Sequence, residues 1–464
     1  MRLAALLLGL LITVPGTLAA RNAVTETPPL AVPGLLEAHL SPDHWIAAMP
    51  DPDGVILTPE QIARQNARMV AEDASIHDLQ ALPARLDGAT VRGWVEDLAS
   101  LPERQLFDAG GNPVEAQTLM EIGNNRALDS VPAGQATRYG MAVRRADLRA
   151  FPTRLRVFHS ADNSDIDRFQ ESALFPGDPL VITHESADGE WYFVVSRRYA
   201  AWIEKQYVAE GSKDEVFAWG RAEPFLVVTG ATANTVYAPE NPRVSEVQLE
   251  MGVRVPVLQG FPPGERINGQ VPAAHHVIEL PVRGDDGALA FEPALLPRSA
   301  DVADDYLPLT GANIIRQAFK FLGERYGWGH SYNARDCSGF VSEIYRSFGV
   351  LIPRNTSRQS ISPALNRLGF TADDDHQARL RALAEARPGD LIYIPGHVMM
   401  VIGHVDGEVF VIHDTAGMSW LPDPEGGLVR LGLNGVVVTP VLPMMSNATT
   451  PTVDRITSIQ RIRR

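Results

Sequence analysis

Residues 336–349 read DCSGFVSEIYRSFG, and this stretch predicts one amphipathic helix. Its apolar side chains recur at helical spacing, and Gly349 follows as a helix stop. Asp336 is a typical N-cap residue, so Cys337 is predicted to lie in the first turn. There the backbone N–H groups and the helix dipole favour negative charge. We therefore predict a lowered pKa for the Cys337 thiol and a nucleophilic thiolate, with the small Ser338 keeping the sulfur accessible.

Cys337 is the single cysteine among 464 residues, so the chain can form no internal disulfide. A lone thiol is either a small buried hydrophobe or a group that is used chemically. Its predicted place at a helix start favours chemical use.

Three strands are predicted further along the chain, at residues 391–394 (LIYI), 397–402 (HVMMVI) and 408–413 (EVFVIH). If residues 404–406 form the loop of the hairpin, Gly403 pairs with Gly407. The same register sets the two terminal histidines of the hairpin directly opposite each other, on one face and within hydrogen-bonding range.

These two histidines, His397 and His413, supply what a cysteine nucleophile needs, namely a base and a partner that orients the base. We predict His397 as the base and His413 as the orienting residue, with His404 as a solvated residue of the turn. A metal site built from Cys337 and the three histidines is the competing use of the same atoms. The sequence contains no H-E-x-x-H or Cys-x-x-Cys pair to support it, so we expect no metal and no cofactor.

The chain resembles the NlpC/P60 cysteine peptidases over roughly residues 306–440. Five motifs carry the resemblance in order and spacing: Tyr326-Gly327-Trp328-Gly329, Asp336-Cys337-Ser338-Gly339-Phe340, Arg387-Pro388-Gly389-Asp390-Leu391, Gly396-His397-Val398, and His413. The resemblance implies a papain-like α+β core and hydrolysis of the bond between γ-D-glutamate and a diamino acid, expected to be meso-diaminopimelate, in peptidoglycan stems. The sequence departs from the family at His330, where a second Gly is common, and at Met399, where Gly or Ala is common.

Upstream of the peptidase region, two β-rich stretches with Pro, Gly and Asn punctuation predict two small barrels in tandem. Arg149 to Thr153, Asp167 to Gln170 and Asp188 to Tyr192 resemble the first bacterial SH3 domain of multi-domain NlpC/P60 peptidases. The fold class is thus a multi-domain chain with an α+β papain-like catalytic domain. The expected segments are a signal peptide (1–20), a mainly helical N-terminal stabilising region (21–140), SH3-like barrels (141–215 and 216–300) and the peptidase domain (301–464).

In such relatives the first SH3 domain narrows the cleft, and acidic groups hold the free amine of an N-terminal L-alanine. By position, Asp336, Ser338 and Tyr326 match that recognition set. Asp336 can also be a helix cap only, and Tyr326 can equally be a core aromatic. Asp167 or Glu171 of the barrel could reach the cleft, but acidic loops are usually just solvated, so neither is assigned to the site.

The N-terminal residues indicate export. Met1-Arg2 is followed by a short apolar run and by small residues, so we expect cleavage after Ala19 or Ala20, with a retained membrane anchor as the alternative. The net charge of −15 disfavours nucleic acid as a partner. We expect a monomer in the periplasm, cell envelope or medium that binds stem peptides (muropeptides), with no integral membrane segment after cleavage.

Two other functions use the same features. In one, the SH3 units bind the wall and the peptidase unit is inert. In the other, the papain-like site performs amidase or acyltransferase chemistry, because nucleophile and base are common to all three reactions.

Overall fold

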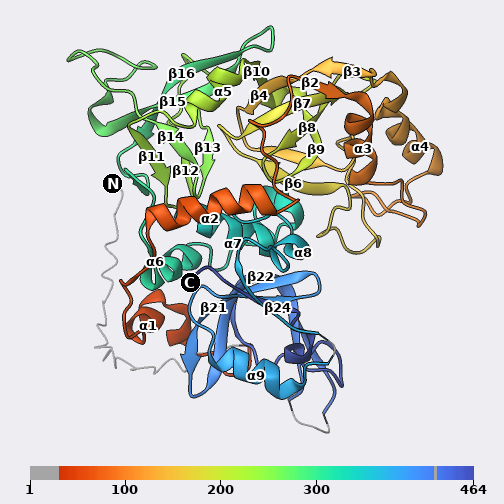
Figure 1. Ribbon diagram of the computed structural model, residues 1–464, viewed down its shortest axis with the longest axis vertical. Helices are drawn as coiled ribbons and strands as arrows, with labels where there is room; N and C mark the ends of the chain where they lie inside the picture. Colours follow the sequence, from red (N-terminus) through yellow and green to blue (C-terminus); the bar gives the residue numbers. More distant parts are fainter. Residues whose placement is uncertain (1–30, 372, 423–425, 464) are drawn as a thin grey trace, which may run out of the picture.

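The computed structural model describes residues 31–371, 373–422 and 426–463. The expected signal peptide, residues 1–20, lies outside the described residues. Figure 1 shows a yellow β-rich body at the upper right, a green one at the upper left and the cyan to blue C-terminal part below them. Helix α2 (Pro59–Glu72) crosses the middle of the molecule between these bodies. The predicted multi-domain architecture of mixed helices and strands is confirmed.

The C-terminal part is built on one antiparallel sheet with the strand order β19-β24-β20-β21-β22-β23. Its strands are β19 (Asn366–Gly369), β20 (Leu391–Ile394), β21 (His397–Val405), β22 (Glu408–Trp420), β23 (Val429–Pro440) and β24 (Ser458–Arg461). Its helices are α6 (Gly311–Phe319), α7 (Cys337–Arg346), α8 (Thr356–Gln359) and α9 (His376–Ala384), with the 3-10 helices η5 (Trp328–Asn333) and η6 (Thr452–Arg455). A two-residue strand, β18 (Leu309–Thr310), precedes α6.

The sheet is covered on both faces because its strand residues alternate between two apolar clusters. On one face Phe340 of α7 shares a cluster with Met400 of β21. On the other face Leu383 of α9 shares a cluster with Val401 of the same strand. Helix α7 therefore lies against the middle of the sheet, at β21 and β22.

The first β-rich body is a seven-stranded antiparallel sheet with the order β10-β4-β7-β8-β9-β5-β6. The strands are β4 (Arg138–Ala142), β5 (Ala146–Arg149), β6 (Gln170–Leu174), β7 (Pro179–Glu185), β8 (Trp191–Ser196), β9 (Ala200–Glu204) and β10 (Val208–Gly211), with η3 (Lys205–Tyr207) between the last two. Asp188-Gly189 form the hairpin turn that connects β7 to β8, and Gly189 has the positive φ of 75° that favours glycine in a turn.

The second β-rich body has three small sheets in place of one continuous sheet: β14-β11-β17, β12-β13 and β15-β16. Its elements are α5 (Lys213–Trp219), β11 (Phe225–Val228), β12 (Thr232–Asn234), β13 (Gln248–Glu250), β14 (Arg254–Pro256), η4 (Pro272–Ala274), β15 (His275–Arg283), β16 (Leu289–Pro297) and β17 (Val302–Ala303). The two bodies share a hydrophobic core that includes Phe175, Trp219 and Leu280. They are therefore packed directly against each other.

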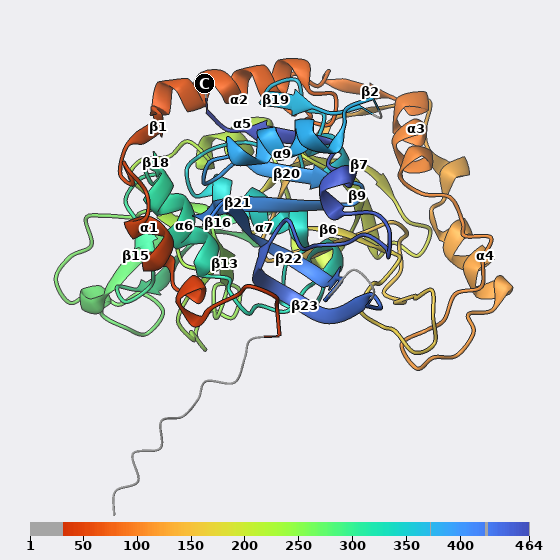
Figure 2. The same cartoon turned by 90° about the horizontal axis from the view of Figure 1, so that it is seen from below.

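The N-terminal region consists of η1 (Glu37–Leu40), α1 (Pro42–Ala47), β1 (Val55–Leu57), α2, β2 (Arg85–Asp87), α3 (Gly88–Leu98), α4 (Ala116–Asn125), η2 (Leu128–Ser130) and β3 (Gly134–Ala136). Figures 1 and 2 place α1 and the α3–α4 pair at opposite ends of the molecule. Helix α2 begins at Pro59, with Thr58 as N-cap. The Asn66 side chain bonds the peptidase part twice, at Gly349 O (2.7 Å) and Leu351 N (2.8 Å).

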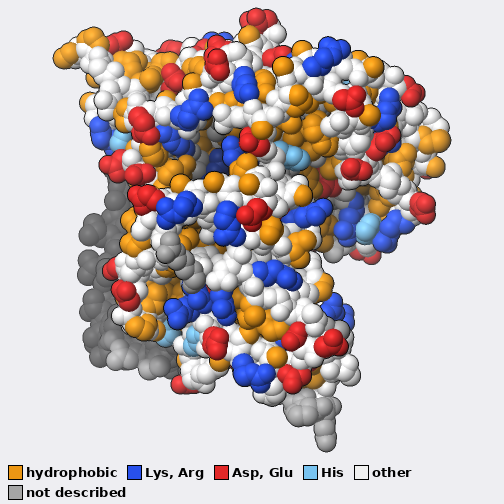
Figure 3. All heavy atoms as spheres, in the orientation of Figure 1, with side chains coloured by type: hydrophobic (Ala, Val, Ile, Leu, Met, Phe, Trp, Pro, Cys, Tyr) orange, Lys and Arg blue, Asp and Glu red, His pale blue; other side chains and the backbone are white. Residues whose placement is uncertain are grey.

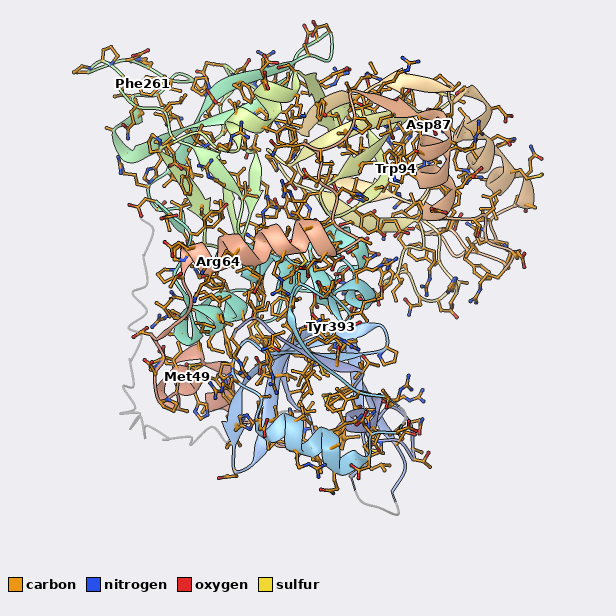
Figure 4. All side chains as sticks on the ribbon, viewed as in Figure 1. Met49, Arg64, Asp87, Trp94, Phe261 and Tyr393 are labelled. Atoms are coloured by element: carbon orange, nitrogen blue, oxygen red, sulfur yellow. The ribbon has the colours of Figure 1, made fainter. Side chains whose placement is uncertain are left out.

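Helix α3 instead packs on the first β-rich body, which is called the first barrel below. Its N-cap Asp87 and Trp94 are labelled in Figure 4 beside the barrel strands, and Val95 clusters with Trp191 and Trp202. The N-terminal region thus joins the barrel to the peptidase part. Within the three described ranges, the structure has no helix that is both long and apolar enough to span a membrane.

Candidate active site

Cys337 is the first residue of α7, as predicted. Asp336 has extended backbone geometry, and its carboxylate accepts a hydrogen bond from Gly339 N at 2.7 Å. The helix begins here because that carboxylate satisfies an N–H group that has no partner within the helix. The sulfur is nearly buried, with 5% of Cys337 exposed, and it lies 3.7 Å from the hydroxyl oxygen of Thr356.

The predicted lowering of the thiol pKa is wrong for this arrangement. Burial and then the negative charge of Asp336 raise the pKa of Cys337 to about 12. Hydrogen bonds from Thr356 and from the backbone of Val398 act in the opposite direction and are outweighed. The residue that caps the helix also places a carboxylate beside the sulfur, so the dipole effect does not prevail.

The turn of the β21–β22 hairpin differs from the predicted one. Val405 pairs with Glu408, so the turn consists of Asp406 and Gly407 alone, with positive φ values of 51° and 84°. Positive φ at both positions is the mark of a type I′ turn, which suits the twist of a two-residue hairpin. His404 consequently belongs to β21, and its Nε2 lies 2.8 Å from Ala386 O, so its predicted place in a solvated turn is wrong.

The two candidate catalytic histidines meet on a diagonal of the ladder. A register shift in β21 leaves Met400 paired with Ile412, which sets His413 across from Met399. The predicted direct opposition of His397 and His413 is therefore wrong, because the turn is shorter and β21 carries an irregularity. Both side chains point to one face, the face that carries Met399 and Val411 and lies opposite α7, and His397 Nε2 lies 2.7 Å from His413 Nδ1. Among the described residues, neither histidine makes a side-chain hydrogen bond with Cys337, whose sulfur lies beside Thr356.

The Thr439 hydroxyl lies behind this pair, beside His413. Thr439 of β23 donates its hydroxyl proton toward Met444 Sδ at 3.9 Å, and its oxygen lies 3.0 Å from His413 Nε2. In the tautomer in which the hydroxyl oxygen accepts from His413 Nε2–H, His413 Nδ1 accepts from His397 Nε2–H. Nδ1 of His397 is left as the ring nitrogen with a free lone pair.

Both imidazoles are neutral at ordinary pH. Burial lowers the pKa of His397 to about 4. Burial together with the neighbouring His397 lowers the pKa of His413 well below its usual value. The pair is thus a neutral base with a neutral orienting partner.

Asp336 is occupied by other groups of the protein. Arg354 donates to both of its carboxylate oxygens, at 3.1 and 2.8 Å, and Gly329 N donates at 3.0 Å. Ser338 donates to the same carboxylate at 3.1 Å and accepts from Arg354 at 2.9 Å. Burial opposes ionisation of Asp336, but Arg354 and His330 hold the pKa of its carboxyl well below the usual range. Two of the three expected substrate-binding residues are thereby bound to Arg354.

His330 stands where the family commonly has glycine, and its contacts account for the difference. It is buried with φ of 67°, a region that favours glycine, and its ring is held on both nitrogens. Nδ1 accepts from Arg354 Nη2 at 2.8 Å, so Nε2–H donates to Glu343 Oε1, also at 2.8 Å. A Cβ added at Gly339 would lie 2.6 Å from the His330 ring, so this position of α7 has room only for glycine.

Tyr326, the third expected substrate-binding residue, is also near the thiol. It is 7% exposed, and its backbone N–H donates to Asn434 O at 3.1 Å. Burial, then the nearby Cys337 and Asp336, raises the pKa of its phenol. The structure therefore brings Tyr326, Asp336 and Cys337 together at one end of α7.

The acid Asp414 follows His413 on β22, and neither the sequence motifs nor the expected pocket included it. Adjacent strand residues face opposite sides, so Asp414 lies on the α7 side of the sheet. Both of its carboxyl oxygens are buried, with no hydrogen-bond partner among the described residues. Burial, then the charges of Asp336 and Glu324, raises its pKa to about 9.

The first barrel touches the segment that leads to the nucleophile. Trp328 Nε1 donates to Gln170 O at 3.0 Å, and Gln170 Nε2 donates to Gly329 O at 2.8 Å. Arg354 Nε donates to Ser172 Oγ of the barrel at 2.7 Å. Strand β6 is thus fixed against η5 and the Arg354 network.

The two barrel acids considered from the sequence are both held by the barrel itself. Asp167 accepts hydrogen bonds from Arg149 and from Phe169 N. Glu171 accepts from the Tyr199 hydroxyl, and burial raises the pKa of its carboxyl. Across the described parts of the chain, no group of three or more His, Cys, Asp or Glu residues is placed to hold a metal ion.

Arg354, Glu343, Thr356 and Thr439 were not singled out from the sequence. They carry no motif, and their bonds join residues that are distant in the chain, such as Arg354 and His330 or Thr439 and His413. Charged and hydroxyl side chains are mostly exposed in proteins, so the sequence alone does not show that these four residues are buried partners of the site.

Comparison with known families identifies two of the parts. Residues 323–419 match the NlpC/P60 family, and residues 156–204 match the SH3 domain of SH3b1 type. The chain therefore contains an NlpC/P60 domain preceded by an SH3 domain, and the predicted resemblance is confirmed for both.

Two curated proteins are similar to parts of the chain. The γ-D-glutamyl-L-lysine dipeptidyl-peptidase of Bacillus cereus is 29% identical over 217 residues, which are 44% of this chain and 54% of that protein. The probable endopeptidase p60 of Listeria seeligeri is 30% identical over 97 residues, which are 20% of this chain and 16% of that protein. The chain thus matches about half of the first relative's length and less of the second.

A solved structure extends the likeness to most of the fold. The NlpC/P60 endopeptidase from Photobacterium damselae subsp. piscicida aligns with a TM-score of 0.69, over 90% of this chain and 94% of that one. Its sequence is 17% identical, so the match concerns the fold. The overall fold therefore occurs in another protein.

Proposed function

We propose that the chain is a cysteine peptidase that cleaves the bond between γ-D-glutamate and the diamino acid of peptidoglycan stem peptides. The observation that carries this proposal is the hydrogen-bonded pair of His397 and His413 in the NlpC/P60 domain whose α7 begins with Cys337. The Bacillus cereus relative, named for action on a γ-D-glutamyl-L-lysine bond, supports the substrate class. In a bacterial wall with diaminopimelate, the corresponding bond is γ-D-glutamyl-diaminopimelate.

The proton arrangement supports general-base attack by a neutral thiol. For this step the His397 ring must reach the Cys337 sulfur, with which it makes no hydrogen bond in the structure. Nδ1 of His397 then takes the thiol proton as the sulfur attacks the γ-carbonyl carbon, and His413 stabilises the imidazolium through Nε2–H. The Cys337 backbone N–H at the start of α7 donates to the oxyanion. His397 then gives its proton to the departing amine, which breaks the amide bond and leaves a thioester. Water, deprotonated by His397, hydrolyses the thioester and restores the thiol.

The barrel supports a preference for short peptides with a free L-alanine. Strand β6 is bonded to η5 next to the nucleophile, so it bounds the cleft beyond the γ-glutamyl residue. Asp336 and Ser338 then act chiefly by holding Arg354 and the start of α7, while Tyr326 faces the substrate. We further propose that the protein works as a monomer outside the cytoplasm, in the periplasm or cell envelope.

Digestion of defined stem peptides tests the proposal. L-Ala-γ-D-Glu-meso-diaminopimelate-D-Ala should yield L-Ala-D-Glu and the diaminopimelate dipeptide, as read by mass spectrometry. The Cys337→Ala variant should fold and give no products, and a chelator should leave wild-type activity unchanged. Turnover by folded Cys337→Ala would disprove the mechanism. Release of any other fragment would favour amidase or acyltransferase chemistry, and wall binding without hydrolysis would favour a binding module.

A further inference from the structure

A cavity of about 400 Å³ lies where four parts of the chain meet. Its wall includes Asn66 of α2, Ser172 of the first barrel, Trp219 of the second β-rich body and Arg346 of the peptidase part. Figure 3 shows Lys and Arg side chains gathered in a hollow above α2. A volume of this size suits a small ligand.

The cavity wall is strongly basic. It contains one acidic residue, Asp178, and six arginines: Arg197, Arg198, Arg221, Arg254, Arg346 and Arg354. Three of the arginines are compensated by carboxylates. Arg346 pairs with Asp178 at 2.7 Å, Arg354 with Asp336 at 2.8 Å, and Arg254 with Glu223 at 3.0 Å.

The other three arginines are not compensated. Arg197, Arg198 and Arg221 have no carboxylate within 4.0 Å among the residues that the structure describes. Nη1 of Arg254 is buried in the same wall without a hydrogen-bond partner. The cavity therefore presents a surplus of about three positive charges, one of them on the exposed Arg221, together with the unused N–H donor of Arg254.

The surplus of positive charge disfavours the charged form of Arg198 while the cavity holds no anion. Burial, then repulsion from the neighbouring Arg346, lowers the pKa of its guanidinium to about 10. Arginine is otherwise charged under all ordinary conditions, so the shift reports a poorly solvated cation beside like charges. An anion in the cavity would supply the missing solvation.

We propose that this cavity binds a small multivalent oxyanion of the phosphate class, with Arg198 as the central ligand. Guanidinium groups match phosphate oxygens with paired N–H donors, and several of them around one enclosed volume favour a charge of two or more. A single carboxylate would leave most of the surplus uncompensated. Inorganic phosphate and a phosphate monoester share the required chemistry.

The bound anion would connect the parts of the chain that line the cavity. Arg198 and Ser172 come from the barrel, Arg346 from α7 and Arg221 from the segment after α5. Arg354 belongs to the same wall and also holds Asp336 next to the nucleophile. An anion that contacts these arginines therefore stabilises the folded junction beside the active site.

The experiment measures thermal unfolding and calorimetric binding of the full chain with pyrophosphate, inorganic phosphate or glycerol 3-phosphate. Sodium chloride at the same ionic strength corrects for screening. We expect a saturable rise in Tm of about 3 °C or more, since a ligand that binds only the folded state stabilises it. A rise with glycerol 3-phosphate alone would indicate an organic monoester, and one with inorganic phosphate or pyrophosphate an inorganic source. Both support the proposal.

Matched variants locate the site. Arg198→Gln should abolish the rise in Tm, whereas Arg64→Gln should keep it, because Arg64 lies exposed on α2 outside the cavity wall (Figure 4). If Arg198→Gln fails to fold, Arg221→Gln, whose side chain is exposed at the cavity, should weaken binding at least tenfold. An equal rise with sodium chloride, or undiminished binding by the folded arginine variants, would overturn the proposal. These readouts do not depend on peptidase activity.

Discussion

His397 Nε2 lies 2.7 Å from His413 Nδ1 although the two residues are not partners in the β21–β22 ladder. The contact is diagonal, and it depends on the turn at Asp406-Gly407 and on the irregularity in β21. The contact occupies Nε2 of the proposed base, so Nδ1 is the ring nitrogen without a hydrogen-bond partner among the described residues.

Alkylation of Cys337 should be slow at neutral pH and should accelerate with every pH unit up to about pH 10, without a plateau. The reason is that the thiolate is the reactive form and the pKa of this thiol is raised to about 12. Because Cys337 is the single cysteine, iodoacetamide uptake measured by mass spectrometry reports it alone. A plateau in rate below pH 8 would show that a thiolate is already present in the free enzyme.

His397→Ala should abolish peptide hydrolysis, whereas His413→Ala should retain a measurable fraction of kcat. A base that takes the thiol proton has no substitute, while water can replace part of the bond that an orienting residue makes. Steady-state kinetics on the defined stem peptide measure both. Comparable activity in wild type and His397→Ala would mean that another group is the base.

Thr439→Val should lower kcat roughly 3- to 10-fold with little change in KM. It removes one hydrogen bond that sets the His413 tautomer, worth about 0.5–1.5 kcal/mol. Thr439→Ser keeps the hydroxyl and serves as the matched control, so it should restore most of the activity. Equal loss of kcat in both variants would show that Thr439 acts through its packing and not by orienting the proton of His413.

Asp414→Asn should stabilise the protein increasingly as pH rises. Asp414 has a pKa of about 9 in the folded state and an ordinary value of 3.8, so the folded state holds an extra proton between these values. The stability of the wild type therefore falls from about pH 4 to about pH 9 through this group, and asparagine cannot ionise. Between pH 5 and pH 8 the gain should grow by up to about 4 kcal/mol, since one extra proton in the folded state costs at most about 1.36 kcal/mol per pH unit.

Urea unfolding of wild type and Asp414→Asn at pH 5 and pH 8 measures this difference. The gap between the two curves should widen with pH. A constant gap would show that the Asp414 carboxyl finds a partner or ionises freely in solution.

Peptides that begin with a free L-alanine should be cleaved much faster than the same peptides linked to muramic acid. The reason is the proposal that strand β6, which is hydrogen-bonded to η5, bounds the substrate cleft. Asp336→Asn is a poor probe of this preference, because it also breaks the Arg354 ion pair and weakens the cap of α7. The measurement is kcat/KM on both peptides, and equal values would indicate an open cleft.

The local sequence determined the elements that carry the chemistry. Asp336 before an apolar 3.6-residue period is enough to predict the start of α7 and the place of Cys337, because a helix cap is a contact between near neighbours. The alternating runs predicted β20, β21 and β22 for the same reason. The two histidines were assigned to one hairpin face, which the structure also has, although the register was wrong.

Only the tertiary structure decided how these elements act together. The pairing of Asp336 with Arg354, the Thr439 hydroxyl behind His413 and the six arginines of the interdomain cavity all join residues that are far apart in the chain. The thiol pKa followed the same rule: a helix dipole can be predicted from sequence, but burial and the charge of Asp336 outweigh it in the folded protein. Electrostatic energies depend on distance and on access to water, and both are set by packing between segments that no local pattern connects.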